Sequence, residues 1–166
     1  MLALKLTDKK DFMNRLLRTP LFDNFLLQEG TVNTKAAFTV DGTINRDFYT
    51  KEELEELGIE GYRFLPFSML RGNFFDLIKG KKTPAAFKFI FLLSPENLAK
   101  TLACISGYTP QDVTGVFLNI RYQNGLLSLT TGVSCRIFST DKTLGNEWDR
   151  MVKQFLKQHE ISFEEL

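Results

Sequence analysis

The segment VTGVFLNIRYQNGLLSLTT, residues 113–131, constrains the fold of this chain more than any other part of the sequence. Its Asn124-Gly125 dipeptide favours a type I′ turn, because both residues tolerate the positive φ angles that a two-residue β-hairpin requires. Pairing across the turn puts apolar side chains on one face and polar side chains on the other, so one face should pack on a core. The predicted pairs are Tyr122 with Leu127, Ile120 with Leu129, Leu118 with Thr131, Arg121 with Ser128 and Asn119 with Thr130.

An order of one strand, one helix and three strands can be read twice along the chain. In residues 2–49 the predicted elements are a strand at 2–6, a helix with Thr7 as N-cap, and strands at 25–29, 32–40 and 43–49. Asp41-Gly42 is predicted as a hairpin turn between the last two strands. In residues 84–140 they are a strand at 86–93, a helix capped by Ser94, the hairpin above and a strand at 133–139.

Helical segments separate and follow these units. Residues 50–80 are predicted as a helical insertion, in which Thr50 and Glu53 form a capping box. Residues 143–159 are predicted as a C-terminal amphipathic helix, and the tail beyond it is expected to fray. The predicted fold class is therefore α+β, a single domain of two βαβββ units with an insertion and a C-terminal helix.

Two βαβββ units in one chain resemble the domain of a DNA sliding clamp, over residues 2–49 and 86–139. The resemblance rests on the order of elements and implies a clamp-like arrangement of sheets and helices. Clamp helices line a ring with Lys and Arg. Here the first helix carries Lys9, Lys10, Arg15 and Arg18, whereas the second carries only Lys100. Because a shared fold does not imply a shared function, the resemblance assigns no role.

A second resemblance covers nearly the whole chain. The strings ELEELGIEG, LIKGKKTP, FLNIRYQNG and MVKQFLKQHEI are similar to those of an uncharacterised family of small bacterial proteins, chiefly from Firmicutes. That family is a domain of unknown function. The resemblance implies a cytosolic bacterial protein and supplies no catalytic residues.

Composition excludes some partners and compartments. The 21 basic and 20 acidic residues leave a net charge of +1, so no overall field draws the chain to nucleic acid or to an anionic membrane. No apolar run approaches the roughly 20 residues of a membrane span. Cys104 and Cys135 have no CxxC spacing, and their apolar surroundings predict buried, reduced thiols. We therefore expect a cytoplasmic protein without membrane contact.

No set of residues for catalysis or for a cofactor can be assembled. His159 is the single histidine and stands at the end of the last predicted helix, where a surface position is expected. Glu52 and Glu56 lie one helical turn apart on a solvated face, where nothing raises the pKa of a carboxyl. We predict no catalytic residue, no cofactor and no metal site; a non-enzymatic role is favoured, and an enzyme is kept as an alternative.

The stretch Gly80-Lys81-Lys82-Thr83 contains the residue types of a phosphate-binding loop without its spacing. It closes a helix instead of opening one, so the favoured interpretation is a glycine cap followed by solvated lysines. The alternative is a basic, anion-binding corner. Its candidate residues are Arg71, Lys79, Lys81 and Lys82, with Lys88 as a further candidate.

The outward face of the second unit carries Phe117, Arg121, Arg136 and Phe138. These residues could bind an oligonucleotide by stacking or a protein partner, since Arg and aromatic residues are enriched in both kinds of site. The favoured interpretation is that the insertion helices cover this face, because exposed Phe on a sheet is a liability.

Three functional hypotheses follow. The first is a non-enzymatic cytosolic binding or scaffolding protein with an unidentified partner, which could be another protein or a second copy of the chain. The second is a nucleic-acid-associated protein with a clamp-like fold, although specific nucleic-acid binding is not expected. The third is an enzyme of an unrecognised type.

Overall fold

The hairpin around Asn124-Gly125 forms the centre of the structure. In the computed structural model, which describes residues 1–166, β5 (Val113–Gln123) pairs with β6 (Leu126–Cys135). All five predicted residue pairs are confirmed. Asn124 and Gly125 have φ angles of 53° and 78°, as the predicted turn requires.

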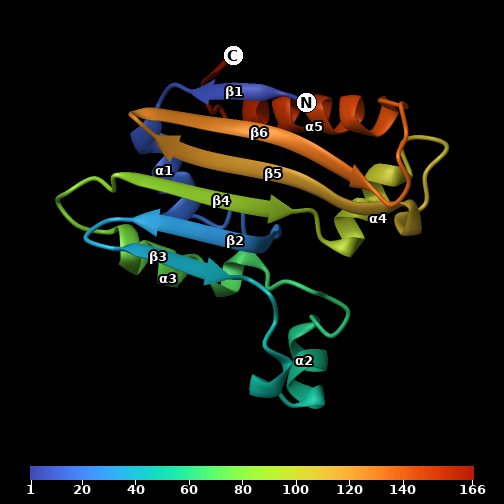
Figure 1. Cartoon of the computed structure of the whole chain (residues 1–166), viewed down its shortest axis with the longest axis horizontal. Helices are drawn as coiled ribbons and strands as arrows, with labels where there is room; N and C mark the ends of the chain where they lie inside the picture. Colours follow the sequence, from blue (N-terminus) through green and yellow to red (C-terminus); the bar gives the residue numbers. More distant parts are fainter.

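Seven strands form one antiparallel sheet in the order β3-β2-β4-β5-β6-β1-β7 (Figure 1). The remaining strands are β1 (Ala3–Leu6), β2 (Leu26–Asn33), β3 (Ala37–Asp41), β4 (Ala86–Leu92) and β7 (Phe163–Glu165). The expectation that the tail frays is wrong, because β7 pairs with β1 and makes an edge of the sheet. The α+β class, the helical insertion and the C-terminal helix are confirmed.

The first unit has one strand fewer than predicted. β2 and β3 reverse direction at residues 34–36, and Asp41-Gly42 lies where β3 ends instead of in a hairpin turn. Gly42 does not have the positive φ of such a turn. It is needed there because a Cβ would stand 1.7 Å from the carbonyl oxygen of Leu27. Beyond it, residues 43–49 contribute an isolated bridge at Thr43 and a short 3₁₀ turn.

The second unit is also βαββ. Its predicted last strand at 133–139 does not form, because β6 continues without a break to Cys135 along the long partner strand β5. The first strands of the two units also have different neighbours. β1 lies between β6 and β7, whereas β4 lies between β2 and β5. The assignment of residues 2–49 and 84–140 as repeats of one unit stays a prediction.

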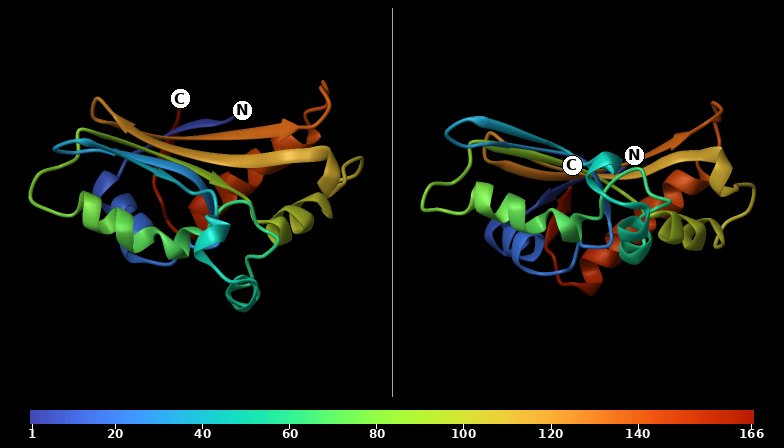
Figure 2. Two further views of the ribbon diagram at one scale, coloured as in Figure 1. Left: turned by 60° about the horizontal axis from the view of Figure 1, so that its bottom comes forward. Right: turned by 90° about the horizontal axis from the view of Figure 1, so that it is seen from below.

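The helices lie on one side of the sheet (Figure 2). α1 (Lys9–Arg18), α3 (Arg71–Ile78), α4 (Pro95–Leu102) and α5 (Thr143–Gln158) lie against that face, and α2 (Lys51–Leu57) extends beyond the β3 edge. Local capping signals explain several helix starts. Thr50 with Glu53 forms the predicted capping box, and the hydroxyl of Ser94 accepts the amide of Asn97. The N-cap of α1 is Asp8, one residue after the predicted Thr7.

Phenylalanine dominates the core between the sheet and these helices. Phe22, Phe67, Phe74, Phe89 and Phe91 are fully buried. Their rings meet in edge and stacked pairs, and the centroids of Phe67 and Phe91 are 4.9 Å apart. Aromatic pairs of this kind add to the free energy of burial, so this cluster holds the helices to the sheet.

The opposite face of the sheet carries no helix (Figure 2). The interpretation that the insertion helices cover it is therefore wrong. α3 packs on the same side as α1, and α2 lies off the sheet edge. An antiparallel sheet can leave one face in water when that face is mostly polar. We refer to this surface as the open face.

Candidate functional site

A row of polar residues crosses the open face near the strand ends that adjoin the Asn124-Gly125 turn. The strand registers align Thr31, Lys88, Arg121, Ser128 and Lys5 from β2 to β1. Lys88 and Arg121 are exposed and lie directly opposite each other, at a Cβ separation of about 5 Å for paired residues. Neither side chain forms a salt bridge. Like charges opposite each other repel, so this position favours an incoming anion.

Acidic residues stand toward the margins of the open face. Glu29 pairs with Asp41 across β2 and β3, and Glu164 on the opposite edge strand lies across from Lys5. The amide and hydroxyl of Thr43 hold the pKa of the Asp41 carboxyl below its ordinary value, so that group stays negative. The face therefore has positive charge without a salt-bridge partner on the middle strands β4 and β5, and negative charge toward both edge strands.

An apolar row lies four residues along the strands from Lys88 and Arg121, about 13 Å away on the same face. Leu26, Leu92, Phe117 and Gly132 align across β2, β4, β5 and β6. The ring of Phe117 lies over Gly115, where an added Cβ would come within 2.6 Å of it. Phe117 and Arg121 thus share the open face, as their alternation along β5 predicts.

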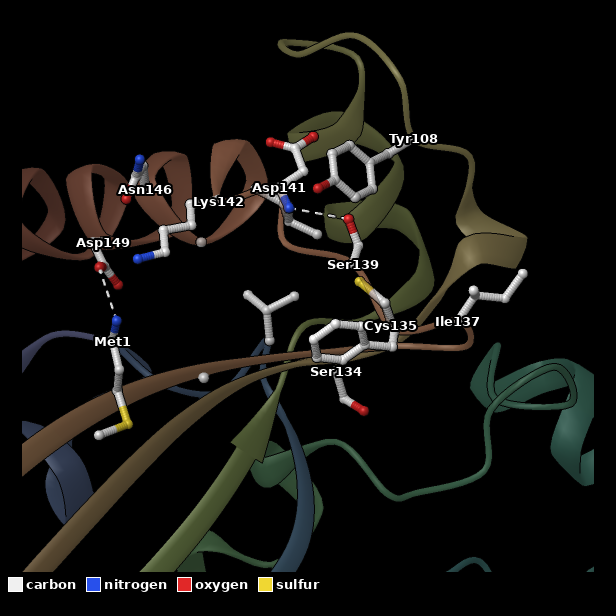
Figure 3. A pocket seen from close by; sticks show the side chains of 15 residues that line it. Met1, Tyr108, Ser134, Cys135, Ile137, Ser139, Asp141, Lys142, Asn146 and Asp149 are labelled. Atoms are coloured by element: carbon white, nitrogen blue, oxygen red, sulfur yellow. Dashed lines mark hydrogen bonds and ion pairs between the residues drawn. The ribbon is translucent and has the colours of Figure 1, made fainter.

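Arg136 and Phe138 do not lie on the sheet. β6 ends at Cys135, and both residues belong to the loop that leads to α5. Ile137 and Phe138 are 78% and 92% exposed and border a hollow of about 530 Å³ (Figure 3). The sequence pattern had placed them on the sheet because it could not show where the strand stops.

Polar groups line the hollow in Figure 3. The N-terminal amine of Met1 lies 3.9 Å from a carboxylate oxygen of Asp149, and the amide of Asp141 donates to the hydroxyl of Ser139. Burial and a hydrogen bond to Asp141 raise the pKa of Tyr108, so its phenol remains protonated. These polar groups satisfy one another, which is typical of a structural role.

The predicted basic corner is only partly assembled. Lys79, Lys81 and Lys82 line a hollow of about 630 Å³ together with Lys35, which the sequence analysis did not identify. Lys79 already pairs with Asp76 at 3.2 Å. Arg71 is not available to a ligand here, because its guanidinium binds both carboxylate oxygens of Asp23 at 2.9 and 3.3 Å.

A family model described as a family of unknown function, DUF5721, matches residues 15–164. The chain belongs to DUF5721. No curated protein and no solved structure matches it. The expected membership in an uncharacterised domain family is confirmed, the function of the family remains unknown, and the clamp resemblance gains no support.

Metal-ligand clusters and membrane-length apolar helices are both absent from the structure of this DUF5721 chain. No three His, Cys, Asp or Glu residues lie close enough together to hold a metal ion. The ring of His159 packs on that of Phe155, with 4.8 Å between the centroids. No helix combines the length and the apolar character needed to cross a bilayer.

The Arg71–Asp23 pair leads to a stability prediction for this DUF5721 protein. The two side chains are 29% and 14% exposed, so removing the guanidinium leaves a carboxylate that is largely shielded from water. We expect Arg71→Ala to lower the free energy of unfolding by about 1–3 kcal/mol in urea denaturation. Lys79→Ala is the matched control, because its pair with Asp76 is exposed and should contribute less than about 0.5 kcal/mol. Equal losses in both variants would contradict a structural role for Arg71.

The prediction that both thiols are buried is wrong for Cys104. α4 ends at Leu102, so Cys104 lies in the following turn and is exposed, whereas Cys135 is partly buried. We expect a thiol reagent to label the native protein in one fast and one slow phase, because labelling requires access to the sulfur. Cys104→Ser should remove the fast phase and Cys135→Ser the slow one. A fast phase that survives Cys104→Ser would refute this assignment.

Proposed function

We propose that this protein is a non-enzymatic binding protein that docks a protein partner on its open face. The observation that carries the proposal is the like-charged couple Lys88 and Arg121, which lies on the middle strands of a sheet surface without a helix and forms no salt bridge, although Arg121 donates a hydrogen bond to Gln123. A carboxylate from a partner would relieve the repulsion between them and would be bound by charge-assisted hydrogen bonds. Phe117, four residues earlier on β5 and on the same face as Arg121, offers the aromatic contact that interfaces favour.

The charge pattern favours protein over nucleic acid. Nucleic-acid interfaces are strongly positive, whereas this face has cations on its middle strands and Glu29, Asp41 and Glu164 toward its edge strands. Such alternation of sign fits a surface that carries both charges, as protein surfaces do. It also disfavours a second copy centred on the same spot, because Lys88 and Arg121 would meet the same cations.

A cytoplasmic location is part of the proposal. Cys104 and Cys135 are both free in the structure, and free thiols persist in reducing compartments. The partner would then be another protein of the same compartment.

The test begins with a photoreactive residue in place of Asn119, which neighbours Arg121 on the open face. Crosslinked proteins are identified, and each is purified and titrated with the unlabelled chain. We expect the double variant Lys88→Glu, Arg121→Glu to weaken the affinity at least about tenfold, because a charge reversal turns attraction into repulsion. Lys10→Glu, an exposed change on α1 at the helical face, should leave it unchanged. Equal affinities in all three proteins would overturn the proposal.

Nucleic-acid binding is the competing outcome. Two central cations on phosphates would give a slope of about −2 for log K against log salt, because each contact contributes about −0.9. Binding of an oligonucleotide with that slope, lost in the double variant, would replace a protein partner with nucleic acid. Binding that is lost only when Lys81 and Lys82 become alanine would move the site to the basic corner.

A further inference from the structure

A separate cleft opens on the helical side of the sheet, between α4 and α5. It encloses about 410 Å³, and 11 of its 15 lining residues are hydrophobic. Leu118 and Leu129 of the sheet form its floor, Met151 and Phe155 of α5 form one wall, and Thr101 of α4 stands opposite. Clefts of about 300–1,000 Å³ with mostly apolar linings are typical small-molecule sites.

The polar groups in the wall of the cleft are already satisfied within the protein. The indole N–H of Trp148 donates to the carbonyl oxygen of Phe117 at 2.8 Å. The hydroxyl of Thr101 donates to the backbone carbonyl oxygen of Asn97 at 2.9 Å. No buried side-chain polar atom lacks a partner. The interior of the cleft therefore presents carbon, which is better covered by an apolar group than by water.

The rim supplies one charge. Lys100 is the single charged residue that lines the cleft, and it forms no salt bridge. Glu96, one helical turn earlier, accepts a hydrogen bond from the hydroxyl of Tyr62 at 2.7 Å and does not line the cleft. The side-chain amides of Asn24 and Asn97 also lie at the rim and can donate to an anion.

We propose that this cleft binds a small amphipathic anion, with an alkyl or aromatic tail against Leu118 and Phe155 and its anionic head near Lys100. The apolar lining selects the tail, and the lone cation selects the sign of the head. The site lies on the opposite side of the sheet from the open face, so this proposal does not depend on the proposed protein partner.

Trp148 makes the test direct, because it is the only tryptophan of the chain and lines the cleft. Decanoate, titrated below its micelle concentration, should change the emission of Trp148 in a saturable way. Decyltrimethylammonium, with the same tail and the opposite charge, should bind at least about fivefold more weakly if Lys100 selects the head. Lys100→Ala should abolish the preference for decanoate. Lys157 is an exposed lysine of α5 outside the cleft, so Lys157→Ala should leave that preference unchanged.

Two further readouts locate the ligand. Decanoate should protect Cys104, which lines the cleft, from a thiol reagent in a Cys135→Ser background. Met151→Glu should abolish decanoate binding, and Gln154→Glu, an exposed change on the same helix, should not. Circular dichroism confirms that each variant is folded. Absence of a saturable change in emission, equal binding of both head groups, or decanoate binding that survives Met151→Glu would each overturn the proposal.

Discussion

Phe91→Ala should lower the free energy of unfolding by about 3–5 kcal/mol, because it removes a fully buried ring and leaves a cavity. The Phe91 ring packs against four other rings. Its centroid lies 4.9 Å from that of Phe67, 5.7 Å from Phe25 and 5.9 Å from both Phe22 and Phe89. Surroundings built from rigid rings relax poorly, so we expect the upper part of this range. Urea denaturation followed by circular dichroism measures the change.

Phe138→Ala is the matched control, because this side chain is 92% exposed. Its effect should remain within about 0.5 kcal/mol, as for most surface substitutions. Phe91→Leu keeps part of the volume and should cost about 1–2 kcal/mol, which preserves a measurable transition if the alanine variant does not fold. A loss below about 1 kcal/mol for Phe91→Ala would contradict the described core.

Gly42→Ala should destabilise the protein by about 3 kcal/mol or more, because the added methyl group overlaps backbone that cannot move away. An ideal Cβ at this position would lie 1.7 Å from the carbonyl oxygen of Leu27. The segment is held from both sides, since the amide of Gly42 donates to Gln28 and its carbonyl accepts the amide of Leu65, both at 2.9 Å. Thermal and chemical denaturation should both report the loss.

Gly72→Ala is the control, and it should change the stability of the protein in the opposite direction. Gly72 lies in α3 with no atom within 4 Å of an added Cβ. Alanine there should stabilise the protein by about 0.5–1 kcal/mol, because glycine loses more backbone entropy when a helix forms. If Gly42→Ala and Gly72→Ala destabilised the protein equally, the close contact between Gly42 and the backbone of Leu27 would not explain the need for glycine at position 42.

Local physics explains which parts of the fold could be predicted. Asn124-Gly125, Thr50 with Glu53, and Ser94 each act within a few residues, and the structure confirms all three. Asp41-Gly42 has the composition of the same kind of turn, but contact with Leu27 decides its conformation. Strand order escaped prediction for a related reason. The neighbouring strand of β1 is β6, more than 100 residues away, and the sequence of neither strand indicates that they pair.

The candidate site was predictable to the extent that strand alternation holds. Phe117 and Arg121 were found because they alternate along a real strand, whereas Arg136 and Phe138 continue the pattern past its end. Arg71 was misread because Asp23, its partner, lies 48 residues away. The cleft between α4 and α5 carries no sequence signal, since its shape depends on how two helices sit on the sheet.

The place of β1 determines when the protein can fold during synthesis. β1 precedes every other strand of the sheet along the chain, yet it pairs only with β6 and β7, and the amide of Leu166 donates to the carbonyl oxygen of Ala3 at 3.0 Å. During synthesis β1 therefore stays unpaired along both edges until β6 and β7 have been made. Unpaired edges of this kind recruit other chains, so interrupted translation products should be prone to aggregate and to need a chaperone.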